Sequence, residues 1–222
     1  EIVKAMVGRE LGSFYPEKNN KIGEVIFEVK NYNVFDNIGK QRVKNANFTL
    51  KKGEILGISG LIGSGRTELI SSIFGTYEGS KTGECIFNGK KINIKSAKEA
   101  LKTGISMVPE DRKQDGIIAD MSVEKNMTLS NLDSYTKAAD YVDTYREKTD
   151  VRRYIDLLKI KTTSEDLAIK NLSGGNQQKV VLAKNLLVNP KIIILDEPTR
   201  GVDVGAKYEI YKNIVELAER GI

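Results

Sequence analysis

The chain has 222 residues, of which 40% are hydrophobic, and its 35 lysines and arginines against 30 aspartates and glutamates give a formal net charge of +5. This balance excludes a disordered chain, and the charge is spread along the sequence without the basic block expected of a protein that binds nucleic acid through charge. The single cysteine, Cys85, excludes an internal disulfide and suits a reducing cytoplasm. No apolar run approaches the roughly 18 to 20 residues of a membrane span, so we expect no direct membrane insertion.

The first part of the chain, residues 1–22, predicts a short helix around residues 2–7 followed by a polar linker without periodic apolar residues. We interpret it as a connector from an upstream domain. The chain begins without a methionine and stops after a helix, where a strand is expected next, so we expect a fragment of a longer protein.

Two strands are predicted at residues 24–32 and 43–50, because Phe48 and Leu50 alternate with polar neighbours. Residues 54–59 form a nearly continuous apolar run, which predicts a buried strand. A glycine-rich loop follows, and apolar residues then recur at helical spacing up to Gly75. Strand, loop and helix in this order predict the opening of a parallel α/β sheet.

A capping-box pattern at residues 96–99 predicts a helix that ends near Gly104, and a strand is predicted at residues 105–109. The character then changes, because amphipathic helices are predicted within residues 121–132 and around Val151, Ile155 and Leu158. We assign residues 117–171 to a helical subdomain inserted into a core of residues 23–116 and 172–222. Beyond Ser173 we predict a helix over residues 174–188, stopped by Pro190, and a buried strand over residues 192–195.

The loop at residues 60–67 has the spacing of a phosphate-binding loop, in which small residues let backbone N–H groups wrap phosphate oxygens at a helix N-terminus. Thr67 would offer its hydroxyl to Mg²⁺. Arg66 stands where the pattern has lysine, and its planar fork does not reproduce a lysine ammonium between two phosphates. Taken alone, the loop also suits a tight glycine turn. The candidate nucleotide-binding residues here are Gly60, Gly63, Ser64, Gly65, Arg66 and Thr67.

The strand at residues 192–195 ends in two acids, Asp196 and Glu197. An aspartate at this place can hold Mg²⁺, and the glutamate beside it can polarise the water that attacks a γ-phosphate. Acids at strand ends are common in α/β proteins, so the pair alone does not indicate a nucleotide site. It does so together with the glycine loop expected at the mouth of the same sheet.

The string LSGGNQQ at residues 172–178 places a serine and two glycines at the start of a helix. Such a start is a second anion-binding helix terminus, which a single nucleotide site would not need. In isolation the Ser-Gly-Gly step would fit an ordinary capped helix, but the full string stands immediately upstream of the strand that ends in two acids.

The glycine loop, the string LSGGNQQ and the string LDEPTRGVD at residues 195–203 resemble the ABC (ATP-binding cassette) ATPases, and the resemblance covers nearly the whole chain from about Val7 on. The strings at residues 53–58, 108–113 and 203–208 are similar to the second, C-terminal cassette of the bacterial monosaccharide importers of the ribose, galactose and xylose type, with the xylose type nearest. The resemblance implies a P-loop NTPase fold: a RecA-like α/β core with an antiparallel β edge and an inserted helical subdomain.

The resemblance also implies roles for individual positions. Asp196 and Glu197 would be the Walker B aspartate and the catalytic glutamate, and Asp203 the D-loop residue. Glu110 occupies the place of the usual Q-loop glutamine, and the chain contains no histidine to act as the switch residue. Together with Arg66, these departures imply a degenerate second cassette whose signature completes the site of the first. The signature residues expected to close on that ATP are Ser173, Gly174, Gly175 and Gln177.

By this resemblance we expect ATP and Mg²⁺ as cofactors, and as partners the upstream cassette of the same polypeptide, a membrane permease and, indirectly, an extracytoplasmic sugar-binding protein. The expected location is cytoplasmic, peripheral on the inner face of the cell membrane. Two alternatives stay open: an ABC-type ATPase acting on nucleic acid or the ribosome, and a nucleotide-binding regulatory module without hydrolysis. Tyr32 and Phe35 are candidates for stacking on adenine, although each also suits a core or surface aromatic.

Overall fold

The computed structural model describes residues 15–136 and 141–222. The chain divides into two compact units, and each is described by itself. Of the described residues, unit 1 contains Met107–Ile214 with residues 15–17, and unit 2 contains Lys18–Ser106 with Val215–Ile222. The helix predicted around residues 2–7 lies outside the described residues, and the subdomain boundaries drawn from the sequence at 116/117 and 171/172 stay a prediction.

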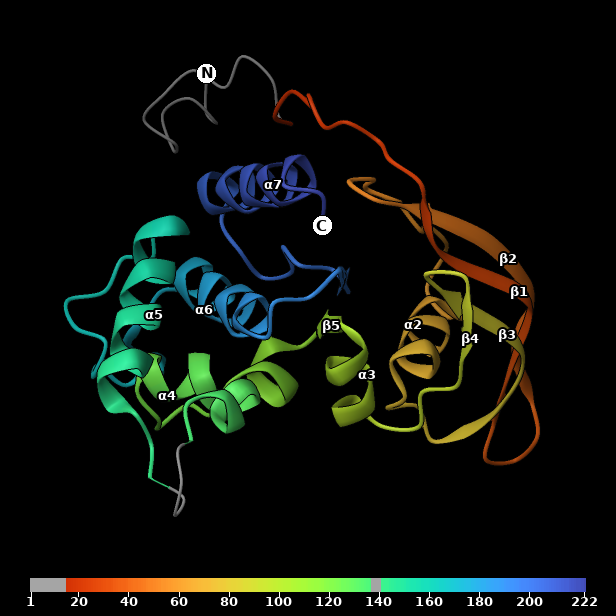
Figure 1. Ribbon diagram of the computed structural model, residues 1–222, viewed down its shortest axis with the longest axis horizontal. Coiled ribbons are helices and arrows are strands. Elements are labelled where there is room, and N and C mark those ends of the chain that lie inside the picture. Colours follow the sequence, from red (N-terminus) through yellow and green to blue (C-terminus); the bar gives the residue numbers. More distant parts are fainter. Residues whose placement is uncertain (1–14, 137–140) are drawn as a thin grey trace. The chain divides into compact units, whose positions relative to one another are not determined.

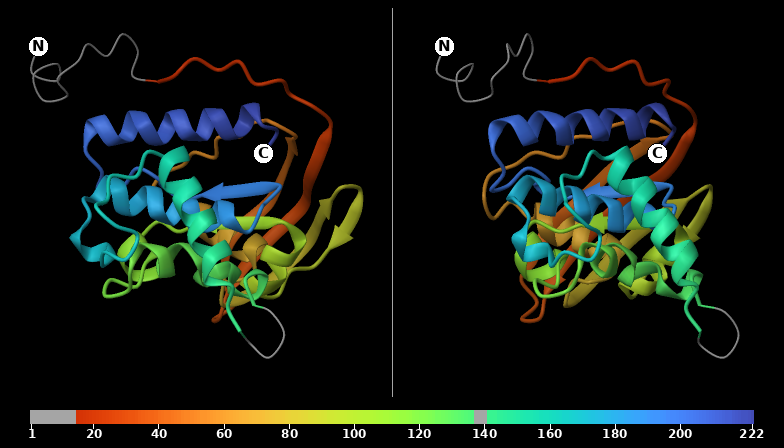
Figure 2. Two further views of the ribbon diagram at one scale, coloured as in Figure 1. Left: turned by 60° about the vertical axis from the view of Figure 1, so that its left-hand side comes forward. Right: turned by 90° about the vertical axis from the view of Figure 1, so that its left-hand side faces the viewer.

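Unit 2 is built on a four-stranded antiparallel sheet in the order β2-β1-β3-β4. Its strands are β1 (Val25–Asp36), β2 (Gln41–Lys51), β3 (Gly79–Phe87) and β4 (Lys90–Ile92). β1 and β2 are the long paired ribbons near the red end of the colour scale (Figures 1 and 2). The first two predicted strands and the antiparallel edge are confirmed.

The register of β1 with β2 shifts at four points, and the two central shifts are β-bulges. The register steps from Val29↔Phe48 to Tyr32↔Ala46 and then to Val34↔Val43, so an extra residue lies first on β1 and then on β2. Asparagines take the left-handed backbone at these points, with φ 49° at both Asn31 and Asn45.

Side-chain amides replace the ladder hydrogen bonds that the bulges remove. The Asn31 N–H donates to Asn47 Oδ1 at 2.8 Å, and the Asn45 N–H donates to Asn33 Oδ1 at 2.9 Å. The backbone N–H groups that the bulges displace therefore bond to side-chain oxygens of the partner strand instead of to its backbone.

Helix α2 (Arg66–Phe74) contacts β1, β2 and β3, and it buries Leu69, Ile73 and Phe74. Each well-buried side chain of this kind contributes on the order of 1.5–3 kcal/mol to folding. The helix ends at Gly75, which has φ 84° and whose N–H donates to Ser71 O. The predicted strand-to-helix loop thus leads into a real helix with the expected end.

Helix α3 (Ala97–Thr103) confirms the capping box. Ser96 is the N-cap and accepts from the Glu99 N–H, while Glu99 Oε2 accepts from the Lys95 N–H at 2.8 Å, and the helix stops at Gly104. The strand β5 (Ile105–Val108) follows, as predicted.

The strand predicted at residues 54–59 is absent from the structure, which shows an irregular segment there. Gly53, with φ 72°, and the bond from Glu54 N to Lys51 O turn the chain out of the antiparallel sheet. In the described chain β5 pairs only with β6 (Ile192–Leu195). Neither strand forms hydrogen bonds of a β-ladder with residues 54–59. An apolar run without ladder partners cannot form a strand, and Ile55, Leu56 and Ile58 remain 36–42% exposed.

Unit 1 places its helices around one apolar core. The main helices are α4 (Val123–Thr128), α5 (Thr144–Leu157) and α6 (Gly174–Leu187), which contact one another, and α7 (Val204–Glu219) begins within the unit (Figure 1). Short turns of helix complete it: the π-helix η1 (Arg112–Gly116) and the 3₁₀ turns η2 (Leu129–Ser134) and η4 (Ile169–Asn171). The helices predicted from periodicity are confirmed, with the one in residues 121–132 divided between α4 and η2.

The helical part of unit 1 also buries a carboxylate. Glu147 is fully buried, and its oxygens accept from Lys125 Nζ at 2.9 Å and Thr128 Oγ1 at 2.6 Å. The ammonium and the hydroxyl make this buried charge tolerable, and they join α5 to α4. Within the described residues, no helix has the length and apolarity needed to cross a bilayer.

Candidate nucleotide site

The glycine loop of unit 2, at residues 60–67, leads directly into the N-terminus of α2. Gly65 is the N-cap with φ 89° and ψ 13°, and no side chain among the described residues caps this end. Ser64 N donates to Leu61 O at 3.0 Å, which folds the loop into a tight turn whose tip residue Ile62 is 100% exposed. An uncapped helix N-terminus behind a solvent-exposed loop can receive an anion.

Gly65 is required by space, because a Cβ there would lie 2.4 Å from the backbone oxygen of Arg42. A Cβ at Gly60 would lie 2.4 Å from Ser64 Oγ, a side-chain atom that can rotate away. Gly63 has open space around it, and its φ of 79° is the reason for glycine there. Arg66 is half-buried, and Thr67, whose hydroxyl is proposed for Mg²⁺, is an exposed residue in the first turn of α2.

The acid pair lies in unit 1, directly after β6. Asp196 is 8% exposed and its N–H donates to Val108 O at 3.0 Å, which fixes it at the end of the β5–β6 pair. Glu197 is exposed and has φ 43°, a left-handed conformation that a non-glycine residue rarely adopts. Backbone strain of this kind concentrates at functional sites.

The start of α6 combines an exposed face with a sealed one. Ser173 is the exposed N-cap, and its Oγ accepts from the side-chain amide of Asn176 at 2.9 Å. Gly175 is buried, and a Cβ there would lie 2.6 Å from Ala206 Cβ. The second glycine is therefore explained by the close approach of α7, while Ser173 is exposed and Gly174 is half-buried beside Arg112.

Gln177 faces the interior. It is 7% exposed, and its Nε2 donates to Ile169 O at 3.3 Å and to Leu172 O at 3.2 Å. The structure thus separates this residue from the exposed Ser173: the glutamine holds the approach to α6 in place, while the serine is open to solvent.

Asp203 stands at the beginning of α7. Its Oδ1 accepts from the Ala206 N–H at 2.9 Å, and its carbonyl accepts from the Lys207 N–H at 2.9 Å. The aspartate is exposed, so it caps the helix and still presents part of its carboxylate to solvent.

Glu110 is ion-paired with Arg200, and Arg112 reaches the same turn. Asp111 between them accepts from the N–H groups of Lys113 and Gln114, and these bonds lower the pKa of its carboxyl group. Sequence reasoning singled out Glu110 but missed both arginines. The signal available was their position, since both lie in strings that carry the family resemblance.

Of the two aromatic candidates, Tyr32 is a core residue: it is 3% exposed, and burial raises the pKa of its hydroxyl. Phe35 is half-buried and precedes the β1–β2 turn.

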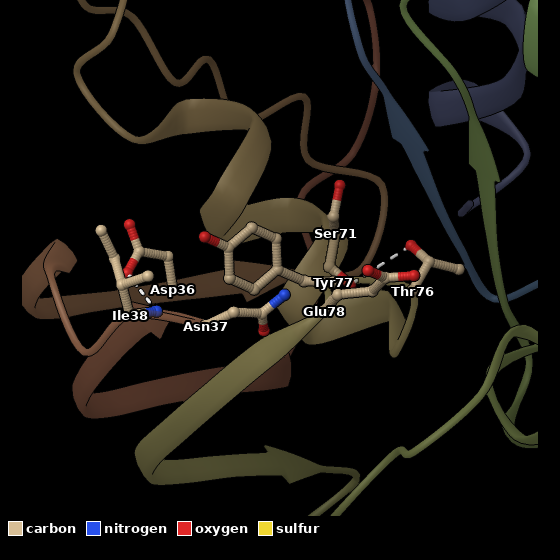
Figure 3. A pocket seen from close by; sticks show the side chains of 7 residues that line it. All are labelled: Asp36, Asn37, Ile38, Ser71, Thr76, Tyr77 and Glu78. Atoms are coloured by element: carbon tan, nitrogen blue, oxygen red, sulfur yellow. Dashed lines mark hydrogen bonds between the residues drawn. The ribbon is translucent and has the colours of Figure 1, made fainter.

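Beside this turn lies an open hollow of about 500 Å³, where Tyr77 stands between Asn37 and the end of α2 (Figure 3). Asp36 holds the turn by accepting from the Ile38 N–H at 3.1 Å.

The predicted residues fall into two groups. Residues 60–67 belong to unit 2, whereas Glu110, Ser173, Gly174, Gly175, Gln177, Asp196, Glu197 and Asp203 belong to unit 1. The donors that Mg²⁺ prefers, a hydroxyl from Thr67 and a carboxylate from Asp196, are present, and the α2 N-terminus suits a phosphate. Within each unit, the types of residue present are therefore those that suit a magnesium nucleotide.

Comparison with known proteins gives a consistent result. Residues 43–200 match the sequence model of a family described as ABC transporter. A xylose import ATP-binding protein, XylG, from Pseudomonas savastanoi pv. phaseolicola is 50% identical over 224 residues, covering 100% of this chain and 43% of that protein. Its counterpart from Moorella thermoacetica is 50% identical over 225 residues and is covered to 44%. The chain thus spans less than half the length of these relatives.

Solved structures agree on the fold. A nucleotide-free ATP-binding cassette from an ABC transporter matches with a TM-score of 0.74 at 23% identity, covering 90% of this chain and 79% of that one. The protein cbiO1 from Clostridium perfringens, part of an ABC transporter complex, matches with a TM-score of 0.71 at 26% identity, covering 89% of this chain and 75% of that one. The predicted fold class is confirmed by this likeness.

Proposed function

The chain belongs to the ABC transporter family, and from this premise we propose that it is an ATP-binding cassette that powers import of a monosaccharide, xylose above all, through a membrane permease. ATP and Mg²⁺ are its cofactors. In this role it sits on the inner face of the cell membrane, docked on the permease, which is fed by an extracytoplasmic sugar-binding protein. The names of the relatives support xylose as the imported sugar, and the cassette fold supports ATP as the energy source.

The observation that carries the proposal is the start of α6. Ser173 is exposed and Gly174 is partly exposed beside Arg112, while Gly175 and Gln177 are buried, so the start of the helix offers its exposed side to something outside its own unit. A phosphate is the natural ligand of such an end. We assign that phosphate to ATP bound by a partner cassette in the same polypeptide.

The chain's own nucleotide site is assigned to the glycine loop and the acid pair. Backbone N–H groups of residues 60–66 would bind phosphate oxygens, Thr67 and Asp196 would hold the metal ion, and Glu197 would orient the attacking water. When bound, Mg²⁺ would supply positive charge to the phosphate oxygens. Arg66 supplies charge without the compact ammonium of lysine, and Glu110 is engaged by Arg200. Both features support a weak site in this cassette.

The deciding experiment measures ATP affinity and turnover in the natural full-length polypeptide and in its Arg66→Lys and Ser173→Arg variants. We expect Arg66→Lys to tighten ATP binding at this cassette and Ser173→Arg to abolish turnover at the partner site. Turnover that survives Ser173→Arg unchanged would contradict the assignment of the signature. Brisk turnover at this cassette that Glu197→Gln removes would make it self-sufficient instead.

The two alternative functions, an ATPase acting on nucleic acid or the ribosome and a regulatory module, predict different results with the same protein. Salt-sensitive nucleic-acid binding would point to an ATPase acting on nucleic acid or the ribosome. Nucleotide binding without any turnover, even with permease and binding protein present, would point to a regulatory module. Xylose-stimulated turnover in the reconstituted importer, without stimulation by ribose, is the result expected here.

A further inference from the structure

The loop after β5 carries an arginine that reaches the turn between β6 and α7. Arg112 Nη1 donates to Arg200 O at 2.8 Å, and Nη2 donates to Gly201 O at 3.4 Å. Two successive carbonyls are thus held by one planar guanidinium. Lysine, with a single ammonium on a flexible stem, does not reproduce this fork.

The same guanidinium packs against the first residue of α6. A Cβ at Gly174 would lie 2.7 Å from Arg112 Nη2, and one at Gly201 would lie 3.5 Å from Nη1. Glycine at these two positions leaves the space that the guanidinium fills. Arg112 therefore lies between the turn and the start of the signature helix, in contact with both.

The backbone beneath Arg112 is fixed as well. Asp111 is the N-cap of η1, and its Oδ1 accepts from Lys113 N at 2.9 Å and from Gln114 N at 3.3 Å. A side chain that starts from a capped turn loses less freedom when it makes its contacts than one that starts from a mobile loop.

The turn that Arg112 holds leads directly into Asp203. Val202 is buried, and Asp203 caps α7 through the Ala206 N–H, while Ala206 meets Gly175. A second tie lies deeper, where Lys179 of α6 donates to Glu209 of α7 at 2.6 Å. The starts of α6 and α7 are consequently parts of one packed block, with Arg112 on its exposed side.

Stability alone does not explain an arginine in this place. A positive charge beside a helix N-terminus is opposed by the helix dipole, and the buried Arg112 Nε has no hydrogen-bond partner among the described residues. Both effects cost free energy, which the two bonds to carbonyls offset. A side chain whose only role was to stabilise the fold would carry neither the unfavourable charge at the helix N-terminus nor an unpaired buried N–H group.

We propose that Arg112 is a positioning residue that fixes the turn at residues 200–203 against the start of α6, so that Ser173, Gly174 and Asp203 meet a partner cassette as one surface. This rests on the proposed function, in which that surface closes on the partner's ATP. Arg112 itself touches no reacting atom. Without it, the signature and the D-loop residue move independently, and the closed arrangement is reached less often.

The test uses the natural full-length polypeptide with Arg112→Ala and Arg112→Lys, and with Lys113→Ala as the matched control, because Lys113 is an exposed cation on the same turn. Hydrogen exchange of amides 200–206 and 173–177 is measured without nucleotide, and kcat and KM of ATP turnover are measured beside it. For Arg112→Ala we expect exchange about tenfold faster in these two segments only. We also expect kcat about tenfold lower with little change in KM. Arg112→Lys should recover part of both, and Lys113→Ala should behave as the unaltered protein.

Three results would overturn the proposal: exchange unchanged in Arg112→Ala, exchange faster throughout the unit, or local exchange faster with kcat unaltered. The second would show that Arg112 only stabilises the fold. If the unaltered polypeptide has no ATP turnover, the proposed function fails instead. The exchange pattern then still shows whether Arg112 fixes the turn, so the two failures are distinguishable.

Discussion

The carboxylate of Glu110 is ion-paired with the guanidinium of Arg200, so the acid at the Q-loop position faces a residue of its own unit. Both side chains are partly exposed, 38% for the glutamate and 53% for the arginine. The pair therefore orders two loops more than it stabilises the fold, because ion pairs of this exposure contribute little free energy.

The first prediction follows from this pair. Glu110→Arg and Arg200→Glu should each lower the free energy of unfolding, and the double variant should recover part of the loss, with a coupling of about 0.5–1 kcal/mol in low salt. Urea unfolding at low salt and at about 1 M salt measures it, and the coupling should shrink at high salt because the Debye length falls to roughly 3 Å. A coupling that salt leaves unchanged would mean that the pair is not solvent-screened.

The second prediction concerns the glycine loop. Gly65→Ala should destabilise unit 2 by about 2–4 kcal/mol, because it combines a positive φ with a Cβ 2.4 Å from Arg42 O. Gly63→Ala is the matched control: its φ is also positive but the space is open, so the cost should be about 1 kcal/mol. Shifts in the urea midpoint rank the two, and equal shifts would contradict the close approach at Gly65.

The third prediction tests the tie between α6 and α7. Lys179 is 2% exposed, and its ammonium is held by Glu209 Oε2 at 2.6 Å and Lys159 O at 3.0 Å. Glu209→Gln should cost about 1–3 kcal/mol, because it leaves a buried ammonium without its counter-charge. Lys179→Met should cost less, because it removes the charge and keeps the apolar stem. Thermal unfolding of both variants decides the order, and the reverse order would show that packing dominates at this position.

The fourth prediction is a pH dependence. Burial raises the pKa of the Cys85 thiol to about 11, against 9.0 for an exposed thiol. Between pH 9 and 11 the unfolded chain loses this proton while the folded one keeps it, so the thiol's contribution to stability falls as pH rises. Cys85→Ala should therefore lose less stability than the unaltered protein over that interval. Urea midpoints at pH 8, 9, 10 and 11 measure the difference, and parallel curves would rule the shift out.

Local signals in the sequence predicted much of this fold. The Ser96–Glu99 capping box, the glycine after α2 and the proline after α6 act over a few residues, and the helix bounds followed from them. The residues proposed for the phosphate loop, the acid pair and the signature were also singled out from short strings.

The contacts that organise the site could not be predicted in this way. Arg112 meets Arg200 across 88 residues of sequence, and no local pattern records such a contact. The strand expected at residues 54–59 failed for a related reason, since a strand depends on partners elsewhere in the chain. Gln177 belonged to a recognisable motif, but only packing shows that its amide points inward.

The bulges of unit 2 have a consequence for the protein in concentrated solution. β2 stands at one end of its sheet, so one edge of this 11-residue strand has no neighbouring strand within the described chain. A straight edge of that length is a template on which other molecules can add strands and begin a fibril. The bulge at Asn45 breaks the regular spacing of the edge, and the exposed cations Arg42 and Lys44 lie just before it on the same strand. Resistance to aggregation is therefore built into the same irregularity that bends the sheet.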